Sequence, residues 1–208
     1  MAQQTPVRDP EKDPLLTPQN SVFAFIDYQP EQYAGVRSVE HAELLAHVTM
    51  LGRIATSFRL PVVLSTVYVK HGMSGTNVEL REALPGVPEI DRTTMNSWED
   101  PEFRAAVERT GRKRLIVAGL WTEVCVAFPV LDALREGYKV YFVEDAIGGV
   151  SRVAHEAAVR RMVQAGAAPI TVLGLACELQ RDWGRAEAER LRAIMREYFS
   201  KLKELKRS

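Results

Sequence analysis

The stretch from Arg114 to Asp145 places the strongest constraint on the fold of this chain. It reads RLIVAGLWTEVCVAFPVLDALREGYKVYFVED: an apolar strand, a short turn, a segment with helical periodicity and a second apolar strand. Neither strand alternates polar with apolar residues, which indicates burial on both faces, as in parallel sheets. This order of elements predicts a parallel sheet covered by helices.

The rest of the chain continues the same alternation. Expected strands cover Ser21–Asp27, Pro61–Val67, Glu89–Thr93, Arg114–Gly119, Tyr138–Val143 and Pro169–Leu173. Expected helices cover Glu40–Phe58, Pro101 to Gly111 with Asp100 as the cap, Glu123–Glu136, Ser151 to Gly166, and the C-terminal segment 184–206. The predicted fold class is α/β: a three-layer α/β/α sandwich around a six-stranded, mainly parallel, Rossmann-like sheet.

The length of 208 residues suits one domain with a full hydrophobic core. Residues 1–18 are polar and punctuated by proline, so we expect a surface arm that can lie on a partner subunit. Residues 19–208 then form the single domain. The apolar stripe of helix 184–206 is longer than one domain usually needs, which predicts a subunit interface and a dimer or higher homo-oligomer.

Composition argues against several kinds of partner. Lys plus Arg equals Asp plus Glu at 27 each, so no global field recruits nucleic acid or a membrane. No run approaches the ~18 consecutive apolar residues of a membrane span, and the N-terminus lacks a signal-peptide pattern. Two cysteines, Cys125 and Cys177, fit a reducing compartment. We therefore expect a cytoplasmic protein that binds neither nucleic acid nor membrane.

Five polar or reactive positions fall at the carboxyl ends of the expected strands, where parallel sheets bind ligands. They are Asp27, the segment Thr66–His71, Arg92, Cys125 and Asp145. Cys125 is expected in the first turn of a helix. Free N–H groups and the helix dipole stabilise a thiolate there, so Cys125 is a candidate nucleophile. A carboxylate at the end of a buried strand, as at Asp27, also calls for a chemical role.

Four motifs carry a family resemblance: FAFIDYQ around Asp27, RTTMNSW from Arg92, AGLWTEVCV around Cys125, and LDALREGYKVYFVEDAIGG. Together they resemble the isochorismatase-like cysteine hydrolases, which include nicotinamidase and N-carbamoylsarcosine amidohydrolase. The resemblance runs from about Ser21 to about Trp183. It implies hydrolysis of a small molecule at an amide-type C–N bond by an Asp, Lys and Cys triad, which maps here to Asp27, Arg92 and Cys125.

The resemblance also implies how the site works. Asp27 accepts the thiol proton of Cys125 and returns it to the leaving amine. The N–H of Cys125 and one from the Leu120–Thr122 turn stabilise the oxyanion. A non-proline cis peptide is expected in this turn, at Trp121–Thr122.

Four residues are expected to line the pocket or the oxyanion site: Tyr28, Trp98, Trp121 and Thr122. Simple core packing is the alternative for each aromatic residue.

Two departures from the family pattern matter. Arg92 replaces the usual lysine and cannot release a proton, so Asp27 must carry every proton unless Lys70 takes over. Nicotinamidases hold a metal with an Asp and two His, whereas VYVKHGMSGTN offers only His71. Because a zinc site needs at least three protein ligands, we expect no metal, and no cofactor is expected either.

Other interpretations remain open at this stage. The chain can be a non-catalytic, ligand-binding or structural oligomer that kept the fold, or a thiol-based redox sensor. Arg92 can form a purely structural ion pair, and Cys125 can be a small core residue. Cys177 is expected to be an ordinary packed thiol, and Asp145 to cap the approach to Ser151 or to face an interface.

Overall fold

A computed structural model describes residues 9, 12–185 and 188–207, and it confirms the predicted α/β architecture. The six strands are β1 (Ser21–Ile26), β2 (Val62–Val67), β3 (Glu89–Arg92), β4 (Arg114–Gly119), β5 (Lys139–Val143) and β6 (Ala168–Ile170). They form one sheet in the order β3-β2-β1-β4-β5-β6, and every neighbouring pair is parallel. This is the strand order of a doubly wound sheet.

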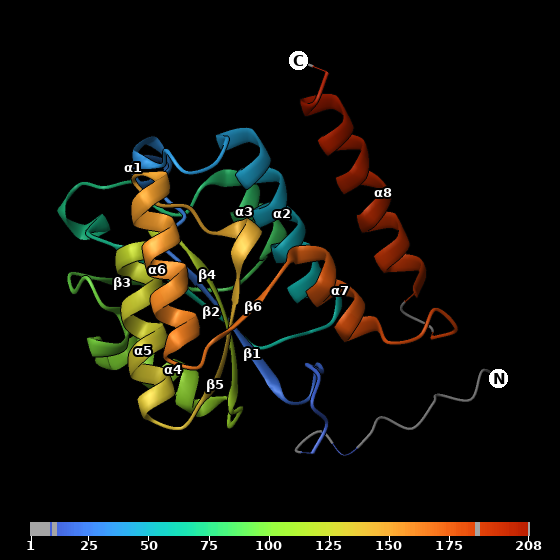
Figure 1. Cartoon of the computed structure of the whole chain (residues 1–208), viewed down its shortest axis with the longest axis horizontal. Coiled ribbons are helices and arrows are strands. Elements are labelled where there is room, and N and C mark those ends of the chain that lie inside the picture. The colour runs from blue at the N-terminus through green and yellow to red at the C-terminus, as the bar shows by residue number, and fades with distance from the viewer. Residues whose placement is uncertain (1–8, 10–11, 186–187, 208) are drawn as a thin grey trace.

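Helices cover both faces of the sheet (Figure 1). The α-helices are α1 (Pro30–Gly35), α2 (His41–Ser57), α3 (Val78–Ala83), α4 (Pro101–Arg109), α5 (Ala127–Arg135), α6 (Arg152–Gln164), α7 (Val172–Gln180) and α8 (Ala188–Leu205). Short helical turns lie at η1 (Val69–His71), η2 (Ser97–Glu99), η3 (Thr122–Val126) and η4 (Glu144–Ala146). On one face of the sheet, helix α2 packs with α3, α7 and α8. On the other face, α5 packs with α6.

Local sequence signals set several of the helix ends. The Asp100 carboxylate accepts the Phe103 N–H at 2.9 Å and starts α4, with Pro101 at its first position. The Ser151 hydroxyl accepts the Ala154 N–H at 3.1 Å and starts α6. Both caps were predicted from the residue types alone.

The end of the sheet differs from the prediction. The strand expected at Pro169–Leu173 ends at Ile170, because Thr171 caps helix α7. This helix, which contains the apolar run LGLACEL, was not predicted. Asp145 accepts the Val172 N–H at 2.9 Å and so supports the start of α7 rather than the approach to Ser151. Cys177 lies on α7 and is exposed, so it is not the packed thiol that we expected.

Part of the expected N-terminal arm packs on its own chain. Leu16 is fully buried, and its N–H donates to Glu178 of α7 at 2.9 Å. The guanidinium of Arg114, on β4, donates to the carbonyl of Leu15 at 2.6 Å. Residues 1–8 and 10–11 of the arm lie outside the described residues, so its contact with a partner stays a prediction.

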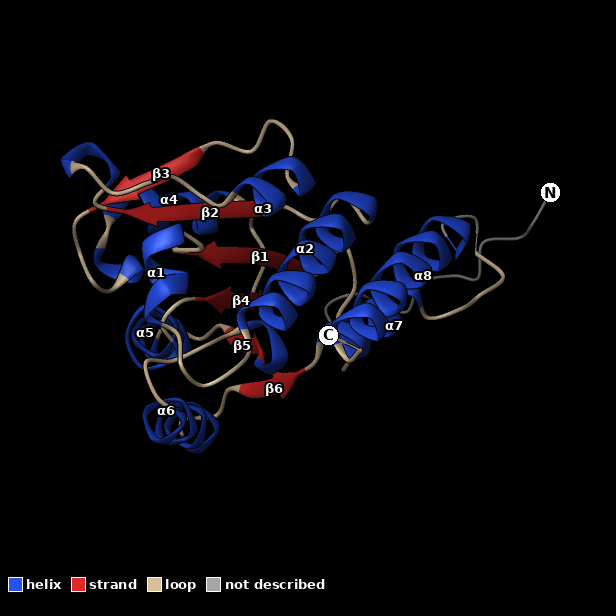
Figure 2. Cartoon of the chain, turned by 90° about the horizontal axis from the view of Figure 1, so that it is seen from above, coloured by secondary structure: helices blue, strands red, loops and turns tan. Residues whose placement is uncertain are grey.

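Helix α8 stands beyond α2 at one side of the domain (Figures 1 and 2). Its Leu191 is fully buried, and its Tyr198 hydroxyl forms a 2.8 Å hydrogen bond with Nδ1 of His47 on α2. The interface expected for residues 184–206 stays a prediction. In the described ranges, none of the helices is long and apolar enough to cross a bilayer.

Candidate active site

The site forms where the strand order reverses, between β1 and β4. The register pairs Ile26 with Gly119, so the chain leaves both strands at the same level. A Cβ on Gly119 would lie 2.7 Å from the Ile26 carbonyl oxygen, so only glycine allows this close approach. The Leu120 N–H then donates to the same carbonyl at 3.0 Å. Asp27 and the turn after β4 are thereby held side by side.

Asp27 directly follows β1 and has no exposed surface. Its backbone is left-handed, with φ of 56°, a conformation that Asp adopts more readily than most residues. The Asp27 N–H donates to the Ser65 carbonyl of β2 at 2.9 Å. These contacts turn the chain sharply after β1. They leave the Asp27 side chain at the edge of the sheet where the parallel strands end.

Gln29 is a site residue that sequence analysis missed. Its buried side chain accepts the Val67 N–H at 2.8 Å and donates to the Val67 carbonyl at 3.0 Å. It also donates to the Ser74 carbonyl at 2.7 Å. The amide therefore holds the ends of β1 and β2 together behind Asp27. Its place in the motif FAFIDYQ was the available signal.

Arg92 ends β3 and reaches across to Asp27. Its Nη2 lies 2.7 Å from Asp27 Oδ2, and both side chains are completely buried. The other guanidinium nitrogens, Nε and Nη1, are buried without a hydrogen-bond partner among the described residues. The sequence-predicted pair is thus in direct contact and carries no net charge.

Cys125 lies on a π-helical turn, η3, that precedes α5. Its residue exposure is 7%, and its thiol lies close enough to the Asp27 carboxyl that their interaction lowers the pKa of Asp27, against the effect of burial. Arg92 binds Oδ2, whereas Oδ1 is buried without a hydrogen-bond partner among the described residues, so Oδ1 is the oxygen left for the thiol. The structure therefore brings together Asp27, Arg92 and Cys125 from the ends of three strands.

The pKa of Cys125 is shifted upward, whereas the sequence predicted a downward shift. Burial raises it to about 12, the Asp27 carboxylate adds to this rise, and the Arg92 charge offsets only part of it. The expected low pKa assumed an accessible sulfur at an α-helix N-terminus, whereas this sulfur is buried beside a carboxylate. Burial also raises the pKa of Asp27, against the opposing effects of Arg92 and of the Cys125 hydrogen bond. The trio therefore holds a proton in its resting state.

The turn before Cys125 supplies candidate oxyanion donors. The N–H of Leu120 donates to Ile26 and that of Thr122 donates to Gly148 at 2.9 Å, so neither is free for a ligand. The Trp121 N–H instead interacts with the Cys125 sulfur and opposes the rise in the pKa of this thiol. The non-proline cis bond is Leu120–Trp121, one residue before the predicted Trp121–Thr122 bond. Leu120 and Thr122 are thus excluded as oxyanion donors, and the N–H groups of Trp121 and Cys125 stay as the candidates.

The four expected pocket residues differ in their surroundings. Trp121 is half-buried, and its indole N–H donates to the Gln32 carbonyl at 2.8 Å. Thr122 is fully buried, with its hydroxyl 2.9 Å from Nδ1 of His155. Both belong to the turn that carries the cysteine.

Tyr28 and Trp98 take the packing role that was their alternative. Tyr28 is fully buried and donates its hydroxyl to the Ala146 carbonyl at 2.5 Å. Trp98 packs edge-on against Phe103 and Tyr138. A pocket role for either residue stays a prediction.

Lys70 does not occupy the place of the missing lysine. It is exposed on η1, and its N–H, like that of Val69, donates to the Asp91 carboxylate. His71 stacks on Tyr68 at a centroid distance of 4.4 Å. In the part of the chain that the structure covers, no group of three or more His, Cys, Asp or Glu side chains is arranged to hold a metal ion.

Comparison with known proteins identifies relatives of this chain. The family model of the isochorismatase domain matches residues 21–173. The probable hydrolase YcaC of Escherichia coli K12 is 40% identical over 170 residues, which is 81% of each chain. Its crystal structure, described as an octameric hydrolase of unknown specificity, aligns with a TM-score of 0.84 and 35% identity over 93% of this chain and 97% of that one.

A second solved relative is YcaC from Pseudomonas aeruginosa, with hexane-2,5-diol and covalent acrylamide. It aligns with a TM-score of 0.83 and 35% identity over 92% of this chain and 97% of that one.

Proposed function

The chain belongs to the isochorismatase family of hydrolases, and we propose that it uses Cys125 as the nucleophile on a small-molecule amide-type C–N bond. The observation that carries the proposal is the buried contact of Cys125 with Asp27, whose other oxygen is held by Arg92 at 2.7 Å. Nucleophile, base and fixed cation meet at the point where doubly wound sheets bind ligands.

Acylation begins with proton transfer from the thiol to Asp27 as the sulfur attacks the amide carbonyl carbon. The C–S bond forms, and the carbonyl oxygen becomes an oxyanion that the N–H groups of Trp121 and Cys125 stabilise. Collapse of this intermediate breaks the C–N bond, and protonated Asp27 gives its proton to the leaving amine. The product of this half-reaction is a thioester on Cys125.

Deacylation uses the same groups in reverse order. Asp27 takes a proton from water as the water oxygen attacks the thioester carbonyl. The second tetrahedral intermediate expels the sulfur, which regains the proton from Asp27, and the carboxylic acid departs. Overall one water molecule is consumed, and one amine and one acid are produced.

Arg92 supplies charge without taking part in proton transfer, because a guanidinium stays protonated at working pH. Its interaction with Asp27 opposes the effect of burial and keeps the carboxylate available as a base. The pair is neutral, so the site offers no excess charge to an ionised substrate. We therefore favour an uncharged amide as the substrate class.

The test compares variants of the two cysteines. Cys125→Ala is expected to abolish hydrolysis across a panel of primary amides, ureas and carbamoyl compounds, whereas Cys177→Ser, at an exposed position, retains it. Acrylamide adds to thiolates, and the P. aeruginosa relative carries it covalently. Peptide mass spectrometry after acrylamide treatment at pH 9 is expected to locate an adduct on Cys125. Hydrolysis at the wild-type rate by Cys125→Ala contradicts the nucleophile role.

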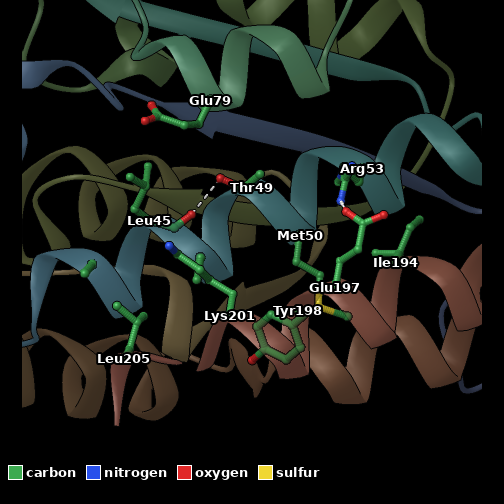
Figure 3. Close-up of a pocket in the computed structure, with 12 residues that line it drawn as sticks. Leu45, Thr49, Met50, Arg53, Glu79, Ile194, Glu197, Tyr198, Lys201 and Leu205 are labelled. Atoms are coloured by element: carbon green, nitrogen blue, oxygen red, sulfur yellow. Dashed lines mark hydrogen bonds and ion pairs between the residues drawn. The ribbon is translucent and has the colours of Figure 1, made fainter. Parts of the chain in front are cut away.

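We also propose that the protein self-associates through α8, in a reducing compartment such as the cytoplasm that keeps both cysteines free. An apolar groove of about 490 Å³ runs between α2 and α8, with Leu45, Met50 and Ile194 among its walls (Figure 3). Phe199, on α8, is 46% exposed. We assign this face to a second copy of the chain, since the E. coli relative, aligned over 97% of its length, is an octamer.

Light scattering after size exclusion tests this interface. The wild type is expected to be a dimer or larger, and Phe199→Asp to shift it toward monomer while Val163→Asp, an exposed apolar position on α6, does not. A monomeric wild type contradicts the proposal.

A further inference from the structure

The turn that carries Cys125 is fastened to the loop between η4 and α6. The Thr122 N–H donates to the Gly148 carbonyl at 2.9 Å, and the Val150 N–H donates to Glu123 Oε1 at 2.9 Å. The first two residues of η3 are therefore both bonded to this loop. This attachment involves elements that the proposed reaction does not use.

A side-chain hydrogen bond adds to these backbone contacts. The hydroxyl of Thr122 lies 2.9 Å from Nδ1 of His155, on the first turns of α6, and Thr122 has no exposed surface. A buried hydroxyl that loses its partner costs free energy, and Thr then bonds to nearby backbone carbonyls instead. In η3 such a new bond changes the path of the turn that leads to Cys125.

The packing at this junction leaves little room for adjustment. A Cβ on Gly149 would lie 2.5 Å from Glu123 Oε2 and 3.1 Å from the Cβ of His155. Loop, turn and helix are thus in van der Waals contact around one glycine. A shift of His155 is transmitted to the turn rather than absorbed by empty space.

We propose that His155 is a positioning residue that, through the Thr122 hydroxyl, holds the turn of Cys125 where the sulfur meets Asp27. The inference rests on the proposed function, because it concerns the placement of the proposed nucleophile. His155 touches none of the reacting atoms and acts only through Thr122.

The charges around His155 fit this role. Burial lowers its pKa, and the carboxylates of Glu144, Glu123 and Glu156 offset part of that effect. The ring is therefore neutral at pH 7, and a neutral imidazole with its proton on Nε2 accepts the hydrogen of the Thr122 hydroxyl.

The experiment follows the rate of iodoacetamide labelling of Cys125 from pH 6 to 10, with the exposed Cys177 of the same molecule as the internal reference. In the wild type the rate at Cys125 is expected to keep rising up to pH 10, since burial raises the pKa of that thiol to about 12. In His155→Leu and Thr122→Val the Cys125 profile is expected to move to lower pH by at least one pH unit, and the rate at Cys177 is expected to stay as in the wild type.

Conservative variants separate positioning from general destabilisation. His155→Asn places an oxygen where Nδ1 lies, and Thr122→Ser keeps the hydroxyl, so both are expected to retain the wild-type profile. The double variant Thr122→Val/His155→Leu is expected to shift no further than either single one, because both remove the same bond. His41→Leu, at an exposed histidine on α2, serves as the matched control.

Failure of the positioning role can be told apart from failure of the proposed nucleophile. An unchanged profile in both His155→Leu and Thr122→Val, or a double variant whose shift is the sum of the two, overturns the positioning role. If His155→Leu does not fold, His155→Asn and His155→Gln decide, since only asparagine reaches the Nδ1 position. If Cys125→Ala retains hydrolysis, the nucleophile assignment fails, while the labelling profiles still test the link between Thr122 and His155.

Discussion

Replacing Arg92 with methionine isolates the contribution of the buried ion pair, since methionine keeps much of the volume and removes the charge. The carboxylate of Asp27, which has no exposed surface, loses its ion-pair partner in this variant, the Arg92 nitrogen that lies 2.7 Å from Oδ2. Removal of one partner of a buried pair costs about 3–5 kcal/mol of folding free energy. At about 2–4 °C per kcal/mol for a chain of this size, the melting temperature falls by roughly 6–20 °C.

The pH dependence of this loss follows from the pKa of Asp27. Burial raises that pKa from its ordinary value of 3.8, and Arg92 is the largest influence that opposes the rise. Without Arg92 the pKa rises further. A carboxyl with a raised folded-state pKa contributes its stability below the unfolded value and loses it as pH rises through the folded value. The penalty of Arg92→Met is therefore expected to be smallest near pH 4 and to grow as the pH rises toward 8.

Urea unfolding at pH 5, 6.5 and 8, followed by circular dichroism, measures the penalty. The double variant Asp27→Asn/Arg92→Met carries no unpaired charge and is expected to recover at least half of the loss at pH 8. Asp27→Asn alone provides the fourth corner of the cycle. Equal losses for Arg92→Met at pH 5 and pH 8, or no recovery in the double variant, refute the reasoning.

Three further predictions concern the reactivity of Cys125, the close approach of β1 and β4 at Gly119, and the Asp100 cap of α4. At pH 7 iodoacetamide is expected to label Cys125 at least tenfold more slowly than Cys177, since burial raises the pKa of Cys125 to about 12; equal rates would contradict this. Gly119→Ala is expected to lower the urea midpoint and abolish hydrolysis, because its Cβ would lie 2.7 Å from the Ile26 carbonyl oxygen; full activity would show that the two strands can separate. Asp100→Ala is expected to cost about 1 kcal/mol through the lost cap of α4 and leave the reaction rate unchanged.

Most of the sheet was predictable because its signals are local. After their first residues, Ser21 and Arg114, strands β1 and β4 are continuous apolar runs; every residue is buried, and the observed ends lie within one residue of the predicted ones. Asp100 and Ser151 mark helix starts through their own hydrogen bonds. The start of α7 was missed, because the apolar run after Pro169 suits a strand or a buried helix equally well.

The gathering of Asp27, Arg92 and Cys125 was also predictable, because parallel strands present their carboxyl ends at one edge. Their electrostatics were not. The pKa of a thiol depends on how deeply the folded chain buries it and on which charges it meets, and the sequence contains neither quantity. The role of Gln29 was likewise hidden, since its partners, Val67 and Ser74, are about 40 residues away along the chain.

The raised pKa values of Cys125 and Asp27 have a consequence for the resting protein. A redox-sensing cysteine is an exposed thiolate, whereas this sulfur is buried and protonated, so it resists adventitious oxidation. In the proposed reaction, activation of the sulfur then coincides with substrate binding, when attack on a carbonyl moves the negative charge from sulfur to an oxygen near the Trp121 and Cys125 N–H groups. Arginine suits the proposed reaction better than lysine, since a partner that never releases its proton leaves Asp27 as the sole proposed proton carrier between thiol and leaving group.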